Sequence, residues 1–337
     1  MLNILACDNS ELPRASHDFF AAAVVGLGTM GAGIAVLLAA RGLEVAVADA
    51  SKDLAAERIG FALARAGPGG SGATRATVDR AAERIHVAAD AESAVSGAEL
   101  VIEAIPEQVD AKLDLLARIS PLVPDAVIAT NTSSLSIDEL SQAVADPSRF
   151  LGVHFFNPPE IVPGVEVVRG LATADLTVAS MVGLLRRLGK QPAVVRSSPG
   201  FIANRLQLAL FLEALACVEE GLVSAEDLDT IARTTFGFRL PAYGPLAVAD
   251  MAGLDVYESI LHELERGFGA RFAVPERVAE LVADGRLGWK TGRGIFEQAM
   301  PISDAARVRD DTYARIAEAV AGIAPASGPD ADRGAAQ

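Results

Sequence analysis

The stretch LGVHFFNPPEIVPGVEVV, residues 151–168, places a histidine and a carboxylate in two successive apolar runs. His154 stands at the end of the first run, and Glu166 follows between valines in VEVV. A neutral imidazole can take a proton at about pH 7, and a carboxylate partner fixes its tautomer and stabilises the charged ring. The pattern is typical of a general base with its orienting acid. A structural histidine beside an edge-strand glutamate explains the spacing equally well, so spacing alone leaves both interpretations open.

A second stretch with chemical meaning is the glycine-rich GLGTMG at 26–31. An apolar run precedes it, no glycine or proline occurs from 34 to 41, and the next apolar run ends in Asp49. This arrangement is the dinucleotide fingerprint. Asp49 is expected to accept hydrogen bonds from the adenosine ribose and to repel a 2′-phosphate, which favours NAD over NADP.

Each residue of this stretch has a separate expected role in binding NAD. Gly26 allows the tight turn, Gly28 lets the backbone approach the pyrophosphate, and Gly31 lets the helix pack against the strand. Thr29 and Met30 complete the loop. The helix N-terminus behind the loop offers N–H groups and a positive dipole to the pyrophosphate.

Composition limits the class of protein. The chain has 337 residues, 51% of them apolar, and a formal net charge of -15. This length predicts two domains, and the charge argues against nucleic acid and against an anionic membrane as partners. The two cysteines, the absence of a signal-peptide pattern and the lack of a long apolar run predict a cytoplasmic protein. No metal site is expected, because the other histidines show no ligand spacing relative to His154.

The elements that must position these residues follow from the hydrophobic pattern. Short runs rich in Val, Ile, Leu and Ala alternate with amphipathic stretches such as 30–41 and 107–119. Such alternation predicts an α/β fold with a Rossmann-type, mainly parallel sheet and helices on both faces. His154 and the glycine loop are then expected at the carboxyl edge of the sheet. The strand candidates are FAAAVVG, LEVAVAD, LVIEAI, AVIAT, LGVHFF, VEVV and AVVR.

The pattern changes at Ser198-Pro199-Gly200, where the boundary to an all-helical C-terminal domain is expected. Pro199 is well placed to begin a helix. The apolar stretch from 201 to 220 predicts one long helix that is buried on most sides, in part by a second subunit. The expected parts of the chain are an N-terminal extension (1–18), an NAD-binding domain (19–198), a helical substrate and dimerisation domain (199–322) and a disordered tail (323–337).

Smaller patterns complete the expected organisation. Ser224 and Asp227 resemble a capping box that opens a helix, and helical patterns follow at 253–267 and 274–284. GPGGSG at 67–72 is expected to be a flexible turn rather than a phosphate loop, because no strand precedes it. LGWKTGRG lacks the phosphate-loop spacing and is expected to be a structural turn.

Several motifs occur in an order that resembles one known family, the NAD-dependent L-3-hydroxyacyl-CoA dehydrogenases, over roughly residues 20–298. The resemblance implies a Rossmann domain, a helical domain that dimerises, an acyl-CoA substrate and a role in fatty acid metabolism. The motifs are Gly26–Gly33, VIEAIPE (101–107), NTSSLSI (131–137), GVHFFNPP (152–159), VEVV (165–168), PGFIANRL (199–206) and LGWKTGRGIF (287–296).

The resemblance also implies roles for single residues. His154 matches the base and Glu166 its partner. Ser133 and Asn204 match residues that hydrogen-bond the reacting oxygen of the substrate and help to fix His154. Asn157 matches a residue beside the same site. Without the resemblance, Ser133 would be an ordinary strand-end serine, whereas Asn204 near the start of an apolar helix is better explained by a role.

Three further matches concern the cofactor. The resemblance places Glu107, Lys112 and Asn131 near the nicotinamide and its ribose. An alternative of equal weight is that neither residue meets the cofactor. Glu107 would then be an exposed acid in the first turn of a helix, and Lys112 would be a surface cation.

Two departures from the family leave the carrier of the acyl group open. The family's CoA enzymes carry lysines after the second strand that meet the CoA phosphates, and none occurs here between 58 and 90. Pro163-Gly164 also changes the loop that lines the acyl pocket. CoA is the favoured carrier, with acyl carrier protein or a free hydroxy acid of the carnitine or gulonate type as alternatives. Arginines that can replace the lysines are Arg58, Arg65, Arg75, Arg80 and Arg84.

Two rival classes are ranked lower. A non-catalytic NAD-binding or crystallin-like protein should have lost site residues, and the catalytic positions are all present here. The β-hydroxyacid dehydrogenases use a lysine at the start of the second domain, where this chain has Asn204 and Arg205.

Overall fold

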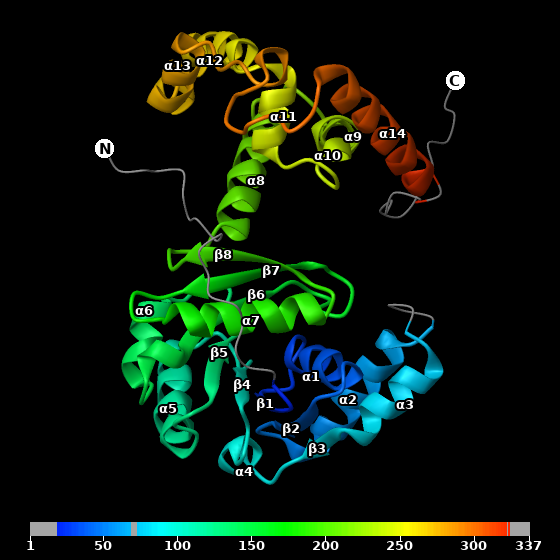
Figure 1. Cartoon of the computed structure of the whole chain (residues 1–337), viewed down its shortest axis with the longest axis vertical. Coiled ribbons are helices and arrows are strands. Elements are labelled where there is room, and N and C mark those ends of the chain that lie inside the picture. The colour runs from blue at the N-terminus through cyan, green and yellow to red at the C-terminus, as the bar shows by residue number, and fades with distance from the viewer. Residues whose placement is uncertain (1–18, 69–72, 322, 324–337) are drawn as a thin grey trace. The chain divides into compact units, whose positions relative to one another are not determined.

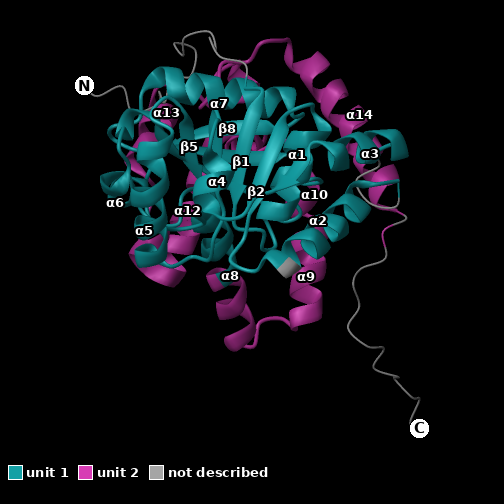
Figure 2. Cartoon of the chain, turned by 90° about the horizontal axis from the view of Figure 1, so that it is seen from below, with its two compact units in different colours: residues 1–211 teal, residues 212–337 magenta. Residues whose placement is uncertain are grey.

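The computed structural model describes residues 19–68, 73–321 and 323 (Figure 1). The expected N-terminal extension with Cys7, residues 69–72 of GPGGSG and the expected tail beyond residue 323 lie outside this part. The chain divides into two compact units, Met1–Phe211 and Leu212–Gln337 (Figure 2).

Unit 1 is built on one sheet with the strand order β3-β2-β1-β4-β5-β6-β7-β8. Neighbouring strands are parallel, except that β6 and β7 are antiparallel. The expectation of a mainly parallel sheet is confirmed. The strands are β1 (Ala21–Val25), β2 (Glu44–Ala48), β3 (Ile85–Val87), β4 (Leu100–Glu103), β5 (Val127–Thr130), β6 (Phe150–Phe155), β7 (Gly164–Arg169) and β8 (Gln191–Arg196).

Helices cover both faces of this sheet, which explains why its central strands are continuous apolar runs. Every residue of β4, β5 and β6 is buried. One hydrophobic core joins the sheet to α1, α2 and α7, and a second joins it to α5 and α6. The helices of this unit are α1 (Gly31–Ala40), α2 (Lys52–Ala66), α3 (Arg75–Glu83), α4 (Ala91–Val95), α5 (Val109–Ile119), α6 (Ile137–Leu140) and α7 (Asp175–Arg187).

The short edge strand β3 was not expected. It consists of Ile85, His86 and Val87, of which the last two are exposed. It pairs with β2 and ends the sheet on that side. A strand of this length with a polar centre carries no apolar run that a sequence pattern could reveal.

The helix that follows the sheet, α8 (Ala203–Glu219), lies within the stretch 201–220 that was expected to be helical, and it does not begin at Pro199. Residues 198–201 form a turn, in which the Phe201 N–H donates to the Ser198 carbonyl at 3.0 Å. Gly200 and Phe201 both have positive φ, 69° and 51°, and a helix cannot continue through such residues. The Phe201 side chain is fully buried, so packing holds this unfavourable conformation in place.

The expectation that α8 is buried on most sides is wrong for the single chain. None of its residues is buried. Its large apolar side chains are exposed, including Leu206 (56%), Leu208 (57%), Phe211 (55%) and Leu212 (64%). Exposed apolar side chains on one helix are typical of an interaction surface.

Unit 2 is helical, as expected. Ser224 accepts a hydrogen bond from the Asp227 N–H at the start of α9, so the predicted cap is present. No helix among the described residues of the whole chain is long and apolar enough to cross a membrane. After α8 the helices are α9 (Ala225–Thr234), α10 (Phe236–Arg239), α11 (Pro245–Ala252), α12 (Leu254–Phe268), α13 (Glu276–Ala283) and α14 (Ile302–Val320).

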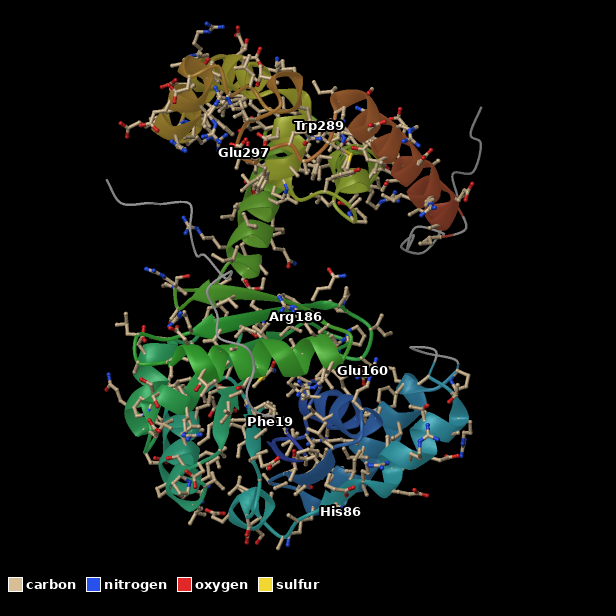
Figure 3. All side chains as sticks on the ribbon, viewed as in Figure 1. Phe19, His86, Glu160, Arg186, Trp289 and Glu297 are labelled. Carbon is tan, nitrogen blue, oxygen red and sulfur yellow. The ribbon has the colours of Figure 1, made fainter. Side chains whose placement is uncertain are left out.

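The LGWKTGRG stretch is a turn fixed by a buried aspartate. Asp250 on α11 is 3% exposed and accepts the N–H groups of Ile295 at 2.9 Å and Phe296 at 2.8 Å. Lys290 in this turn forms an ion pair with Asp255. Asp250 and Asp255 thus fix this turn within unit 2, which agrees with the expected structural role of the motif. Trp289, labelled in Figure 3, belongs to this turn.

Candidate active site

His154 and Glu166 face each other across the only antiparallel pair of strands in the described sheet. In the register of β6 and β7 they are direct partners, so both side chains lie on the same face. His154 Nδ1 lies 2.8 Å from Glu166 Oε2, and the two residues are 5% and 6% exposed. The structure therefore brings together the two residues whose spacing the sequence left open.

Glu166 also anchors the start of α8. Its Oε1 accepts the N–H groups of Ile202 at 3.0 Å and Ala203 at 2.9 Å. Burial raises the pKa of Glu166, but the hydrogen bonds from His154, Ala203 and Ile202 outweigh burial and hold this pKa below its ordinary value. The carboxylate is therefore ionised at neutral pH and acts only as an acceptor, so that His154 Nδ1 must donate.

The other ring nitrogen of His154 is then the basic one. Nε2 carries the lone pair when Nδ1 carries the proton, and it has no hydrogen-bond partner among the described residues. The rings of Phe156 and Phe201 lie 4.4 and 5.7 Å from the imidazole, measured between centroids. These rings pack against the imidazole and shield it from water. Nε2 is therefore the nitrogen that can accept a proton from a substrate.

Asn204 and Ser133 meet beside this pair. Asn204 Nδ2 donates to the Ser133 carbonyl oxygen at 2.8 Å. The start of α8 is thus tied both to Glu166 on β7 and to the loop that follows β5. Asn157 lies in the loop after β6 with an exposed side chain, and no hydrogen bond among the described residues joins it to His154 or Glu166.

Glu107 holds the loop that contains Ser133. Its Oε1 accepts the Thr132 hydroxyl at 2.6 Å and the N–H groups of Ser133 and Ser134 at 2.8 and 3.1 Å. Burial raises the pKa of Glu107, and these hydrogen bonds together with the Lys112 charge bring the pKa below its ordinary value. The alternative of a merely exposed acid does not describe this residue.

Lys112 is not a surface cation either. It is fully buried, and its Nζ donates to Glu103 Oε1 at 2.7 Å and to the Ile105 carbonyl at 3.1 Å. Glu103 also accepts the Thr130 hydroxyl at 2.6 Å. A direct contact of Lys112 with the cofactor remains a prediction, because the observed role of this ammonium is to fix the ends of β4 and β5.

Asn131, expected near the cofactor, has a structural hydrogen bond of the same kind. Its Oδ1 accepts the Phe155 N–H at 3.1 Å, which joins the ends of β5 and β6. Its contact with the cofactor also remains a prediction.

The glycine loop has the geometry that a dinucleotide requires. Gly26 has a φ of 93°, and a side chain there would overlap the backbone of Ala104. A Cβ on Gly31 would overlap the Gly26 carbonyl, whereas no described atom lies within 4 Å of a Cβ on Gly28. No capping or acidic side chain occupies the first turn of α1, so its N–H groups remain available to a phosphate.

A cavity of about 790 Å³ lies beside this loop, at the carboxyl ends of β1, β2 and β4. Gly26, Asp49 and Ile105 are among its lining residues. This position is where a Rossmann sheet receives the adenosine half of a dinucleotide. The residues present therefore fit NAD.

Asp49 is itself held in place. Its Oδ2 accepts the Leu27 N–H at 2.7 Å, and its Oδ1 accepts the Ser51 N–H at 3.0 Å. Arg58 on α2 donates to the same Oδ2 at 2.9 Å. The sequence fingerprint predicted the aspartate but not its arginine partner, which comes from a different element.

Most arginines of the α2–α3 insertion are paired with acids. Arg58, Arg65, Arg75 and Arg84 lie within 4.0 Å of carboxylates, whereas Arg80 donates only to the Thr77 hydroxyl, at 3.4 Å, within the described chain. Most of the cations that were expected to replace the missing lysines therefore have a carboxylate partner in this structure.

A parallel sheet with this glycine turn, next to a histidine–carboxylate pair on the same sheet, defines a dinucleotide-dependent dehydrogenase. The chain belongs to the 3-hydroxyacyl-CoA dehydrogenase family. The family's NAD binding domain matches residues 21–198, and its C-terminal domain matches residues 200–298. The protein is thus an NAD-dependent oxidoreductase of this family.

Individual relatives differ in the substrate that they are named for. The chain is 38% identical to 5-formyl-3-hydroxy-2-methylpyridine 4-carboxylate 5-dehydrogenase of Mesorhizobium japonicum, over 81% of this chain and 89% of the relative. It is 37% identical to a probable 3-hydroxybutyryl-CoA dehydrogenase of Bacillus subtilis, over 81% and 96%. A 3-hydroxyacyl-CoA dehydrogenase structure from Archaeoglobus fulgidus matches with a TM-score of 0.75 and 30% identity, over 90% of this chain and 99% of that one.

The two glycines of the loop give a matched pair of variants. Gly31→Ala should destabilise the free protein by about 2–3 kcal/mol, because the new methyl group overlaps a backbone carbonyl. Gly28→Ala should leave the unfolding free energy within about 0.5 kcal/mol and weaken NADH binding at least about tenfold, because its methyl group points into open space that the pyrophosphate needs. Denaturant unfolding and NADH titration by fluorescence measure the two effects. Normal NADH binding by folded Gly28→Ala would contradict the assigned role.

Proposed function

We propose that the protein oxidises the hydroxyl group of a 3-hydroxyacyl thioester to the 3-oxo form, reversibly and with NAD. The observation that carries the proposal is the His154–Glu166 pair at 2.8 Å, which directs the basic nitrogen of His154 away from the carboxylate. The family match and the glycine loop identify NAD as the cofactor, and the His154–Glu166 pair provides the general base.

The proposed reaction needs one proton acceptor from the chain. NAD, when bound, takes up the hydride that leaves C3 of the substrate. His154 Nε2 takes the hydroxyl proton, so that the electrons of the O–H bond form the new C=O bond as the C–H bond breaks. Glu166 remains ionised and stabilises the imidazolium that results. In the reverse direction His154 returns the proton to the oxygen.

The remaining site residues have supporting roles in this proposal. Ser133 and Asn204 bind the reacting oxygen, and Asn157 binds the acyl group next to it. The hydrogen bond between Asn204 and the Ser133 backbone supports the pairing of the first two. The cofactor contacts are proposed for Gly26, Gly28, Thr29, Met30, Gly31, Asp49, Glu107, Lys112 and Asn131.

Substitution of the base tests the mechanism. His154→Ala should lower kcat by about 10²- to 10⁴-fold and leave NADH binding unchanged, because only the proton acceptor is lost. Glu166→Gln should lower kcat at least about tenfold, since the amide cannot stabilise the imidazolium. His86→Ala is the control, because this histidine lies on β3 with a side chain that is 63% exposed. The measurement is NADH oxidation by absorbance beside NADH titration.

Full activity of His154→Ala would contradict the assignment of the base. A wild-type protein that binds NADH and turns over no hydroxy or oxo acid would instead favour a non-catalytic, NAD-binding or crystallin-like role.

CoA is the proposed carrier because the family and several relatives are named for CoA thioesters. A second candidate is a small free carboxylate, as in the relative named for a pyridine carboxylate. The ion pairs of the α2–α3 insertion favour this second candidate, because they remove most cations that would meet the CoA phosphates. An acyl carrier protein is a third carrier that keeps the same chemistry.

A comparison of carriers decides between these substrates. We expect NADH oxidation with acetoacetyl-CoA to have a kcat/KM at least about tenfold above that with acetoacetate or with the same acyl group on acyl carrier protein. A higher kcat/KM with the carrier-protein form would place the protein in a biosynthetic pathway. Turnover only of free acids would move the substrate class to that of the pyridine-carboxylate relative.

We also propose a homodimer, a cytoplasmic location and a domain boundary near residue 199. The exposed leucines of α8 support the dimer. The sparse cysteines of the sequence support a reducing compartment, and the family matches, which meet between residues 198 and 200, support the boundary.

Sedimentation velocity tests the dimer. The wild type should sediment as a dimer, and Leu212→Glu should weaken the dimer by at least about tenfold in Kd, since it would bury a charge in an apolar interface. Leu171→Glu is the control, because Leu171 is 94% exposed and lies outside α8. A wild type that is monomeric at micromolar concentration would overturn the proposal.

A further inference from the structure

Unit 1 contains a second polar cavity that shares no lining residue with the cavity beside the glycine loop. It measures about 540 Å³ and lies between the C-terminal half of α1, helix α3, the loop after β6 and the turn between α7 and β8. We call it the basic cavity. The residues used in the following argument are Arg41, Thr77, Arg80, Glu160 and Lys190.

The cations of the basic cavity lack carboxylate partners. Within the described residues no acid lies at ion-pair distance from Arg41, Arg80 or Lys190, although most other arginines of the insertion are paired. Arg80 donates only to Thr77, at 3.4 Å. This concentration of unpaired positive charge is unusual in a chain with a net charge of -15.

Lys190 is the most unusual of these cations. It is 7% exposed, and its Nζ donates to a neutral group, the Val162 carbonyl, at 2.8 Å. Burial lowers the pKa of Lys190, Glu160 raises it and Arg41 lowers it again, so Arg41 lies close enough to repel it. Arg41 itself is exposed, but a buried ammonium that is repelled by a neighbouring cation is unfavourable unless an anion lies close to it.

Glu160 cannot neutralise this group alone. It is the only carboxylate among the lining residues; its Oε1 accepts Arg65 Nη2 at 2.8 Å, and its Oε2 is buried without a hydrogen-bond partner among the described residues. Figure 3 shows Glu160 beside α1, near the end of α7. The cations around the cavity therefore outnumber the acids.

We propose that the basic cavity binds a phosphate group of a small molecule. Arg41 and Arg80 would each donate hydrogen bonds to phosphate oxygens, as arginines do at phosphate sites. Lys190 would add a positive charge from the buried side of the cavity. Thr77 offers a hydroxyl donor. The lining also includes apolar side chains, Val36, Leu37, Ile161 and Leu188, which suit an organic group attached to the phosphate.

The cavity and the proposed acyl site share one loop, the loop after β6. The loop after β6 contributes Glu160 and Ile161 to the lining, and the same loop carries Asn157 after the strand of His154. A phosphate would compete with Glu160 for nearby cations. Binding should therefore shift the loop that borders the proposed acyl site.

Binding is measured without turnover, so the result is independent of the proposed reaction. Isothermal titration with adenosine 3′,5′-bisphosphate, in saturating NADH to block the glycine loop, should show one site on the wild type. Arg41→Gln and Arg80→Gln should each weaken this binding at least about tenfold, because each removes a charged hydrogen bond to phosphate. Arg75→Gln is the control: it removes the same charge from the same helix, α3, but its side chain is 84% exposed and it does not line the cavity.

Two further arms complete the test. Inorganic phosphate is titrated as a second probe, and thermal unfolding verifies that each variant is folded. Absence of binding by both probes to the wild type, or binding that Arg41→Gln and Arg80→Gln do not weaken more than Arg75→Gln, would overturn the proposal.

The source of the phosphate is distinguished by competition. If it belongs to a CoA tail, adenosine 3′,5′-bisphosphate should compete with acetoacetyl-CoA, and Arg80→Gln should raise KM for this ester but not for the N-acetylcysteamine thioester. If it belongs to a separate metabolite, the bisphosphate should bind without competing, and KM for the CoA ester should stay unchanged in Arg80→Gln. Both results support the site and name its occupant.

Discussion

The carboxylate of Glu166 is the interaction on which the rest of this site depends. One oxygen receives His154 Nδ1, and the other receives the N–H groups of Ile202 and Ala203. The same side chain thus sets the tautomer of the histidine and fixes where α8 begins. The turn before α8 contains Phe201 with positive φ, a conformation that costs about 1–3 kcal/mol in a non-glycine residue. Burial of the phenyl ring and the two hydrogen bonds to Glu166 offset this cost.

Local patterns in the sequence predicted the parts of the molecule that are themselves local. The glycine loop, Asp49, the apolar strands and the cap at Ser224 follow from spacing and residue type alone. The pairs Glu103–Lys112, Arg58–Asp49 and Arg65–Glu160 did not follow, because each joins elements that only the folded sheet brings together. The start of α8 lies slightly after the start of the predicted stretch 201–220, because the buried Phe201 belongs to the turn before the helix. The roles of the site residues rest on the resemblance and on the geometry.

Several acidic residues of this chain fix loops and turns. Asp49, Glu107 and Asp250 each accept at least two backbone N–H groups, and each fixes a loop or turn. Lys112, in turn, is fully buried and donates to Glu103 and to the Ile105 carbonyl at the end of β4. Such charges are held at fixed places inside the fold. The net charge of the chain is therefore a poor guide to the field at any one place, and an anion site is possible in an acidic protein.

The loop between β6 and β7 has anchors of its own. The ion pair of Glu160 with Arg65 and the hydrogen bond from Lys190 to the Val162 carbonyl hold it to α2 and to the turn before β8. Neither contact involves His154 or Glu166. The Phe156 ring, 4.4 Å from the imidazole, belongs to the surroundings of the proton-transfer pair, whereas the part of the loop after Phe156 is held independently of that pair. Laboratory evolution of new substrates in this scaffold should begin there, and Glu166 should be the last residue to vary, since one change at that position disturbs both the chemistry and the fold.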